Sequence, residues 1–143
     1  MPGDCFDNKL SCKEKGRQFQ ITFPKNAKET ICRAKVDGCI IPKNSLQERC
    51  DYMFMRCVDE DIYFVELKGQ GIKKAYSQII STIEFARPLL KFKQEQVTGF
   101  IIGSRCPLAS AEVQKLKKDF KSKKYGHLLE VHSRKWTHRV GAD

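Results

Sequence analysis

Two apolar runs on either side of a short acidic segment constrain the fold more than any other feature of the sequence. The runs are DYMFMRC (51–57) and IYFVELK (62–68), and the segment between them is VDED (58–61). Aromatic and β-branched runs flanking a polar turn are typical of a β-hairpin. Both runs are apolar at successive positions, which indicates a sheet that is covered on both faces. The sequence therefore predicts a central hairpin inside an α/β protein.

The segments around the hairpin favour a layered arrangement of helices on a mixed sheet. Apolar residues recur at helical spacing from residue 71 onward, and Pro88 should kink or end this helix. Strands are predicted at residues 31–41, 97–105 and 126–133, with a second helix at 107–124. Together with a possible short helix before the first strand, the expected order is (α)βββαβαβ.

The chain of 143 residues is the right length for one domain, and no internal repeat or low-complexity linker divides it. Residues 1–20 are polar and show no period, so we expect a loosely ordered lead-in to a single domain at residues 21–143. We find no apolar run long enough to span a membrane and no apolar core of a signal peptide. The expected location is therefore cytoplasmic.

The net charge of +10 is concentrated in one half of the chain. Residues 71–143 carry 15 Lys and Arg against 6 Asp and Glu, whereas the first half is nearly balanced. This asymmetry favours a polyanionic partner, since cations that neutralise phosphates release counterions. DNA is the expected partner, with RNA as the alternative. A purely solubilising role of the lysines also explains the composition.

The seven cysteines show no metal-binding spacing. No two of them have a gap of two residues, and the three histidines lie far from them along the chain. Without a secretion signal, disulfides are not expected to persist, so most cysteines should be small reduced core residues. A structural zinc site is the less favoured alternative.

The hairpin brings charged residues together at one end. If the turn is centred between residues 59 and 60, Asp51 lies opposite Lys68, and Met53 lies opposite Glu66. Asp51, Glu66 and Lys68 then share one face, although a slip of one residue would move Asp51 to the other. Two carboxylates can hold Mg²⁺, and a lysine beside them can orient water and neutralise phosphate charge. A simple cross-strand ion pair is the alternative.

The same residues carry a resemblance to a known family. Asp51, a gap of fourteen residues, and Glu66-Leu67-Lys68, followed by an amphipathic helix and a strand, resemble the PD-(D/E)XK nuclease superfamily over residues 31–105. The resemblance implies a restriction-endonuclease-like αβββαβ core, with a mixed sheet flanked by helices. It also implies that Asp51 and Glu66 bind Mg²⁺ or Mn²⁺, that Lys68 is catalytic, and that the protein acts as a homodimer.

Further candidates follow from the resemblance and from the charge pattern. Gln78 could supply the polar residue that many members carry in the helix, or it could be a solvated flank. An additional acid could come from Glu29 or Asp37, and the sequence does not choose between them. The expected nucleic-acid contacts are Lys117, Lys118, Lys121, Lys124, Arg134 and Lys135. Trp136 is either a stacking surface for an unpaired base or a cap on the core.

These inferences converge on a small Mg²⁺-dependent endonuclease that hydrolyses DNA phosphodiester bonds with a metal-activated water. Both a junction-resolving role and a restriction-type role are compatible with it. The alternative from another class is a catalytically inactive module of the same fold that binds nucleic acid or protein through the basic half.

Overall fold

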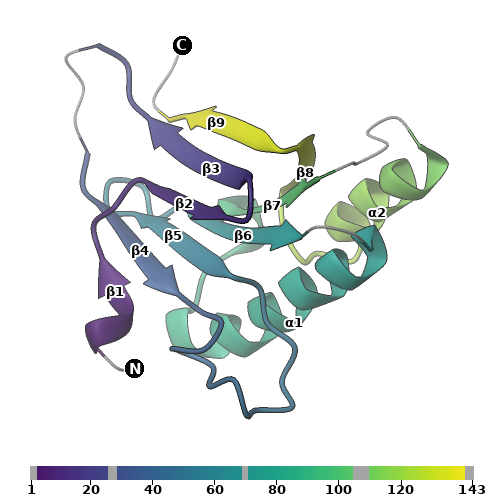
Figure 1. Cartoon of the computed structure of the whole chain (residues 1–143), viewed down its shortest axis with the longest axis horizontal. Coiled ribbons are helices and arrows are strands. Elements are labelled where there is room, and N and C mark those ends of the chain that lie inside the picture. The colour runs from purple at the N-terminus through teal and green to yellow at the C-terminus, as the bar shows by residue number, and fades with distance from the viewer. Residues whose placement is uncertain (1–2, 26–28, 69–70, 105–109, 141–143) are drawn as a thin grey trace.

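The structure is a computed structural model that describes residues 3–25, 29–68, 71–104 and 110–140, with only the backbone of Lys68 (Figure 1). The described residues form two α-helices, α1 (Ile72–Leu90) and α2 (Ala111–Ser122), and two short 3-10 turns, η1 (Gly3–Cys5) and η2 (Gln94–Gln96). The strands are β1 (Phe6–Asp7), β2 (Ser11–Glu14), β3 (Arg17–Thr22), β4 (Ile31–Lys35), β5 (Tyr52–Arg56), β6 (Ile62–Lys68), β7 (Val97–Gly103), β8 (Leu128–Ser133) and β9 (Lys135–Arg139).

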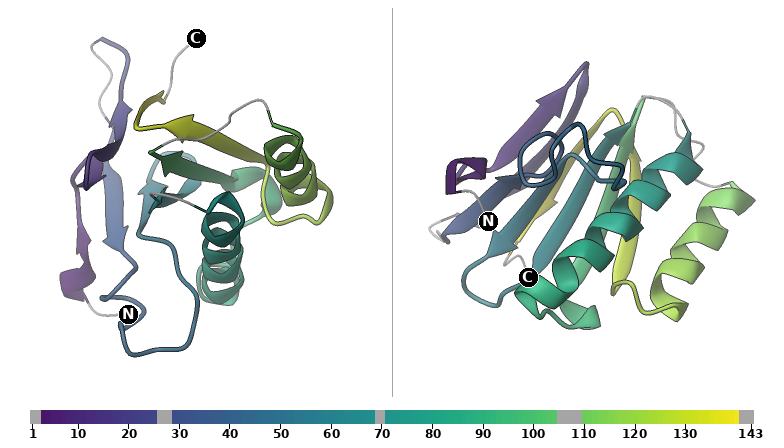
Figure 2. Two further views of the ribbon diagram at one scale, coloured as in Figure 1. Left: turned by 45° about the vertical axis from the view of Figure 1, so that its right-hand side comes forward. Right: turned by 90° about the horizontal axis from the view of Figure 1, so that it is seen from below.

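The elements form three layers around a six-stranded sheet in the order β1-β4-β5-β6-β7-β8. Its β4-β5-β6 part is antiparallel and its β6-β7-β8 part is parallel, which confirms an α/β protein with a mixed sheet. Both helices lie on the same face, as Figure 2 shows. A three-stranded sheet, β2-β3-β9, covers the other face. Among the described residues, the helices expected to flank the sheet therefore lie on one face only.

The central strands are buried on both faces, as their continuous apolar runs predict. In β6, Phe64 packs in the cluster that contains Ile79 of α1 and Phe120 of α2. Its neighbours in the strand face the other way, because successive side chains alternate. On that side Val65 belongs to the cluster that contains Phe19 of β3. Each face of the sheet thus has its own apolar core.

The ends of the helices agree with the sequence in part. Pro88 lies inside α1, and the helix ends two residues later, where Lys91 takes a left-handed conformation with φ 54°. Pro88 has no backbone N–H to donate to the carbonyl four residues earlier. Because it lies in the last turn of α1, this loss affects only the end of the helix. The second helix begins later than predicted, at Ala111, and is capped by Ser110, whose hydroxyl accepts from the backbone N–H of Val113 at 3.2 Å.

The N-terminal segment is more ordered than its polar sequence indicates. β1 pairs with β4, β2 forms a hairpin with β3, and β3 pairs in parallel with β9. Instead of a loose lead-in, residues 3–22 add a strand to the central sheet and build most of the second sheet. The short helix expected before β4 would include residues 26–28, which lie outside the described residues.

A disulfide joins Cys5 to Cys39, contrary to the expectation that all cysteines are reduced. The bond links η1 to the turn after β4 and so fastens the N-terminal segment to the central sheet. Cys12 and Cys50 are buried thiols, as predicted, whereas Cys32 is half-buried and Cys57 is exposed. Cys106 lies outside the described residues.

The described helices were also compared with the length and hydropathy that a bilayer requires. None of them is both long and apolar enough to cross a membrane.

Candidate active site

The register of the β5–β6 hairpin differs by two residues from the predicted one. Met53 pairs with Phe64 rather than with Glu66. The cause is an earlier turn, in which the N–H of Arg56 donates to the carbonyl of Asp61 at 2.9 Å. A shift of two residues leaves every side chain on its predicted face. It also brings Asp51, just before β5, level with Glu66 instead of Lys68.

Asp51 and Glu66 form a carboxyl pair at this end of the hairpin. The two side chains interact, and the interaction with Glu66 opposes the rise in the pKa of the Asp51 carboxyl. The Oδ2 atom of Asp51 also accepts from the backbone N–H of Leu67 at 2.8 Å. Burial raises the pKa of the Asp51 carboxyl to about 6, and the Leu67 N–H opposes this shift. Glu66 is only 3% exposed.

Asp37 is brought to the same place by a β-bulge. The backbone N–H groups of Val36 and Asp37 both donate to the carbonyl of Asp51, at 2.9 and 3.4 Å. Asp37 lines a cavity of about 240 Å³ together with Asp51. Its carboxylate is held by Arg49, with Nε to Oδ1 at 2.8 Å. Of the two further acids considered from the sequence, Asp37 is the one beside the pair.

Glu29 lies at the opposite end of β5. Its carboxylate binds the guanidinium of Arg56 through two hydrogen bonds, at 2.8 and 2.6 Å. Arg56 is the last residue of β5, whereas Asp51 precedes the first, so the length of the strand separates them. Glu29 is therefore a structural partner of Arg56 and not part of the acid pair.

Gln78 lies near the pair but in a different cavity. Its Nε2 donates to the carbonyl of Arg49 at 3.1 Å, and it lines a space of about 360 Å³ with Asp37, Glu48 and Lys74. Its Oε1 is buried and has no hydrogen-bond partner among the described residues. Asp37 lines both cavities, so Gln78 is a neighbour of the site rather than a member.

Lys68 is the last residue of β6, and its backbone pairs with Gly103 of β7. It is thus two residues beyond Glu66 on the same strand, as the motif requires. Its side chain lies outside the described residues.

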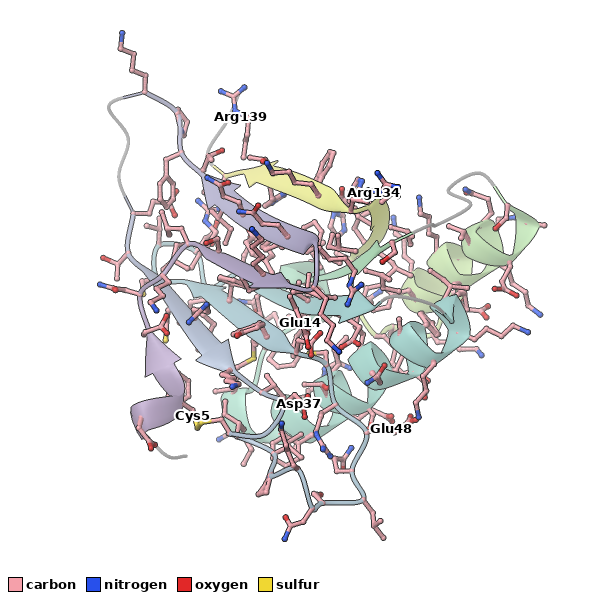
Figure 3. The ribbon with its side chains drawn as sticks, in the orientation of Figure 1. Cys5, Glu14, Asp37, Glu48, Arg134 and Arg139 are labelled. Atoms are coloured by element: carbon pink, nitrogen blue, oxygen red, sulfur yellow. A yellow bond between two sulfur atoms is a disulfide. The ribbon has the colours of Figure 1, made fainter. Side chains whose placement is uncertain are left out.

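Two residues that line the site come from the N-terminal hairpin and were not predicted as site residues from the sequence. Glu14 and Lys13, from β2, line the cavity of Asp51, with Lys35, Lys43 and Tyr52. Figure 3 shows Glu14 and Asp37 on the same side of the molecule, at the end of β2 and after β4. The charge of Glu14 adds to the rise in the pKa of Asp51. The alternation of β3 and the Lys15-Gly16 turn, with positive φ at both residues, are the sequence signals for this hairpin.

The predicted nucleic-acid contacts divide into two groups. Arg134 and Lys135 lie at the site's edge of the sheet, because the N–H of Arg134 donates to the carbonyl of Gly103 at 2.6 Å. The helix α2 carries Lys117, Lys118 and Lys121, and Lys124 follows it. This helix runs away from that edge and leads to His127, whose N–H donates to the carbonyl of Val97 at the start of β7. Lys121 and Lys124 are therefore remote from Glu66.

Trp136 is packed rather than free. Its ring stacks on His132 with a centroid distance of 3.5 Å and an interplanar angle of 4°. It also packs against the core cluster beneath the second sheet. The core-capping interpretation of Trp136 therefore fits its surroundings better than a base-stacking role.

The donor set suits a hard cation that keeps part of its water shell. In the described part of the chain, no group of three or more His, Cys, Asp or Glu side chains could enclose a metal ion. Mg²⁺, however, is often bound by one or two carboxylates and several waters. A cation between Asp51 and Glu66 could offset the charge of both carboxylates. The carboxyl pair therefore fits Mg²⁺ or Mn²⁺ as a partly hydrated ion.

Searches against protein-family models, curated proteins and solved structures return no match to this chain.

Proposed function

We propose that the chain is a metal-dependent nuclease of restriction-endonuclease-like fold that hydrolyses DNA phosphodiester bonds. The observation that carries the proposal is the carboxyl pair of Asp51 and Glu66 on adjacent strands, at the end where β6 also brings Lys68. Burial raises the pKa of Asp51, which lines a cavity, and a carboxyl group with a raised pKa in a cleft is a candidate for function. A simple surface ion pair would not need a second buried carboxyl group.

The order of the elements is consistent with this fold. An antiparallel β4-β5-β6 meander is followed by α1 and by β7 parallel to β6, which matches the βββαβ part of the proposed core. In place of a first helix, the chain has the β2-β3-β9 sheet on the far face. In the proposal, this sheet covers the core where that helix would lie.

Asp51 and Glu66 would hold Mg²⁺ or Mn²⁺. When bound, such an ion lowers the pKa of a coordinated water and offsets charge on the phosphate. The chain itself orients the carboxyl groups, because the N–H of Leu67 fixes Asp51 and the ladder of β6 fixes Glu66. Lys13, Lys35 and Lys43 at the cavity would bind phosphate oxygens on either side of the scissile bond. Lys68 would orient the attacking water and neutralise charge on the scissile phosphate.

DNA is the proposed substrate and RNA the alternative. The edge that carries the pair also carries Arg134 and Lys135, which would contact the phosphate backbone next to the site. A homodimer with one site for each strand belongs to the same proposal.

The proposal is tested with supercoiled plasmid and branched DNA, incubated with Mg²⁺, Mn²⁺ or EDTA. The wild type should cut in either metal and not in EDTA. Glu66→Gln and Lys68→Ala should lose about a hundredfold or more in rate, since each removes a group used in the transition state. Glu95→Gln, an exposed acid just before β7, is the matched control and should cut normally.

Two outcomes would overturn the assignment. Equal cutting by the wild type and Glu66→Gln would remove the carboxyl pair from the reaction. Salt-sensitive DNA binding without cleavage in either metal would support the inactive binding module instead.

A further inference from the structure

Three sulfur-bearing side chains lie together on the helix-facing side of β4 and β5. Cys32 pairs directly with Met55, which packs against the core on the helix side. Cys57 lies two residues beyond Met55, and its N–H donates to the carbonyl of Thr30 at 3.2 Å, so it keeps the register of the ladder. Residues two apart on a strand share a face, so all three side chains are on one side.

The three residues line a cavity of about 360 Å³ with Ile62, Leu90 and Phe92. Met55 and Ile62 are at the turn end of the hairpin, so the cavity is remote from Asp51 and Glu66. The thiols are accessible, because Cys32 is half-buried and Cys57 is exposed. Neither takes part in the disulfide.

The spacing of the sulfur atoms suits a bridging ion better than a disulfide. Diagonal partners in an antiparallel pair are about 7–8 Å apart at Cα, which is too far for a disulfide without movement of the backbone. An ion with metal–sulfur bonds of about 2.3 Å can span that separation. Thiolate and thioether ligands together select soft cations, and among biological metals they favour Cu(I).

The electrostatics agree with a cation between the thiols. Burial raises the pKa of the Cys32 thiol, and the neighbouring Cys57 raises it further. A cation between the two sulfur atoms supplies the positive charge that a thiolate at Cys32 requires. The guanidinium of Arg56, which lines the cavity, does not supply this charge, because it is bound by Glu29, Asp59 and Asp61.

We propose that Cys32, Met55 and Cys57 form a binding site for a soft monovalent cation, represented by Cu(I). Binding replaces two S–H protons with two sulfur–copper bonds, and the thioether adds a third ligand. Two protons are released for each ion, copper remains Cu(I), and no oxidant or reductant is needed.

The test titrates Cu(I) into the anaerobic full-length chain, without added thiols, against a coloured Cu(I) chelator. One ion per chain should bind, with about two protons released. Cys32→Ser and Cys57→Ser should each lose about a hundredfold in affinity and Met55→Leu about tenfold, because the thiolates are the stronger ligands. Cys12→Ala removes a buried thiol in the other core and is the control, with unchanged affinity.

A second measurement does not depend on the folding of any variant. In the wild type, Cu(I) should protect Cys32 and Cys57 from alkylation, as read by peptide mass spectrometry. Unprotected thiols in the presence of Cu(I), or full affinity in the Cys32→Ser/Cys57→Ser double variant, would overturn the proposal. Glu66→Gln should bind Cu(I) like the wild type, which separates this site from the nuclease proposal.

Discussion

At the scale of single residues, the Asp51 carboxyl is the most consequential group. Its pKa is raised above the ordinary value by burial, so between about pH 4 and pH 6 the native state holds a proton that the unfolded chain has released. The free energy of unfolding therefore falls as the pH rises through this window, and it stays lower above it. At pH 8 the ionised carboxylate costs roughly 2–3 kcal/mol.

Asp51→Asn should therefore stabilise the protein at alkaline pH. The amide oxygen can still accept from the N–H of Leu67, and the buried charge is gone. We expect a rise in Tm of several degrees at pH 8 and almost none at pH 4, measured by calorimetry across this range. Glu95→Gln should leave the pH profile unchanged. An equal rise at both ends of the range would show that Asp51 does not titrate as described.

Mg²⁺ should stabilise the wild type at pH 8 through the same pair. A ligand that binds only the native state adds about 1 kcal/mol at roughly ten times its Kd. A millimolar thermal-shift titration should therefore raise the Tm of the wild type but not that of Glu66→Gln. The same shift in both proteins would place any bound Mg²⁺ elsewhere.

At the scale of elements, the apolar patterns of the sequence predicted the helices and strands whose formation depends on neighbouring residues. The apolar runs of β5 and β6 and the stripe of α1 were sufficient to predict these elements and their faces. The register was wrong by two residues because Arg56 starts the turn early, held by Asp59 at 2.7 Å and Asp61 at 3.6 Å. From the sequence these acids indicated only a turn, and nothing marked Arg56 as their partner.

The N-terminal strands were missed for a physical reason of another kind. In β3 only Phe19 and Ile21 are buried apolar residues, and the alternate positions Gln18, Gln20 and Thr22 face outward. Such a strand is stable only against its neighbour, and the neighbour β9 is at the other end of the chain. The pairing with β9 leaves no local signal, so the position of the β2–β3 hairpin over the central sheet, and of Glu14 at the site, could not be predicted from the sequence.

The two groups of basic residues should contribute differently to DNA binding. Lys135 lies at the edge of the sheet that also carries Asp51 and Glu66. Lys135→Ala should reduce the magnitude of the slope of log K against log salt concentration by about 1, the value for one lost phosphate contact. Lys121→Ala, near the end of α2, should leave the slope unchanged. Fluorescence anisotropy with a labelled duplex at several salt concentrations measures both. A larger effect of Lys121→Ala would place the DNA on the helical face.

Gly126, between α2 and β8, tests the packing of the second helix. A Cβ atom there would lie 2.4 Å from a ring carbon of Phe120 and 2.9 Å from Val97. Gly126→Ala should therefore lower the free energy of unfolding by about 1–3 kcal/mol through overpacking. Gly3→Ala meets nothing within 4 Å and is the control. Urea denaturation measures the free energy of unfolding of both variants. A Gly126→Ala variant as stable as Gly3→Ala would contradict this packing.

At the scale of the whole molecule, the Cys5–Cys39 disulfide fixes the N-terminal segment to the central sheet. The sequence argument failed here because it rested on the expected compartment, whereas the bond depends on which residues the fold brings together. Nothing local to Cys5 or Cys39 indicates that β1 pairs with β4, and this pairing places them side by side.

Reducing this disulfide should lower the free energy of unfolding by about 2–4 kcal/mol, as expected for a loop of this length. The two cysteines are 34 residues apart in the sequence. Urea denaturation with and without dithiothreitol measures the effect. The Cys5→Ser/Cys39→Ser double variant should be as stable as the reduced wild type and insensitive to dithiothreitol. A stable wild type after complete reduction would contradict the prediction.

The pairing of β3 with β9 also has a consequence for synthesis on the ribosome. Residues 17–22 leave the exit tunnel early, but their parallel partner, residues 135–139, follows only after the helices and the central sheet. Until then Phe19 and Ile21 have only the β2 hairpin beside them, and one face of the central sheet lacks part of its cover. The nascent chain must therefore keep this face from aggregating, and a stop codon shortly before residue 135 would leave it permanently incomplete.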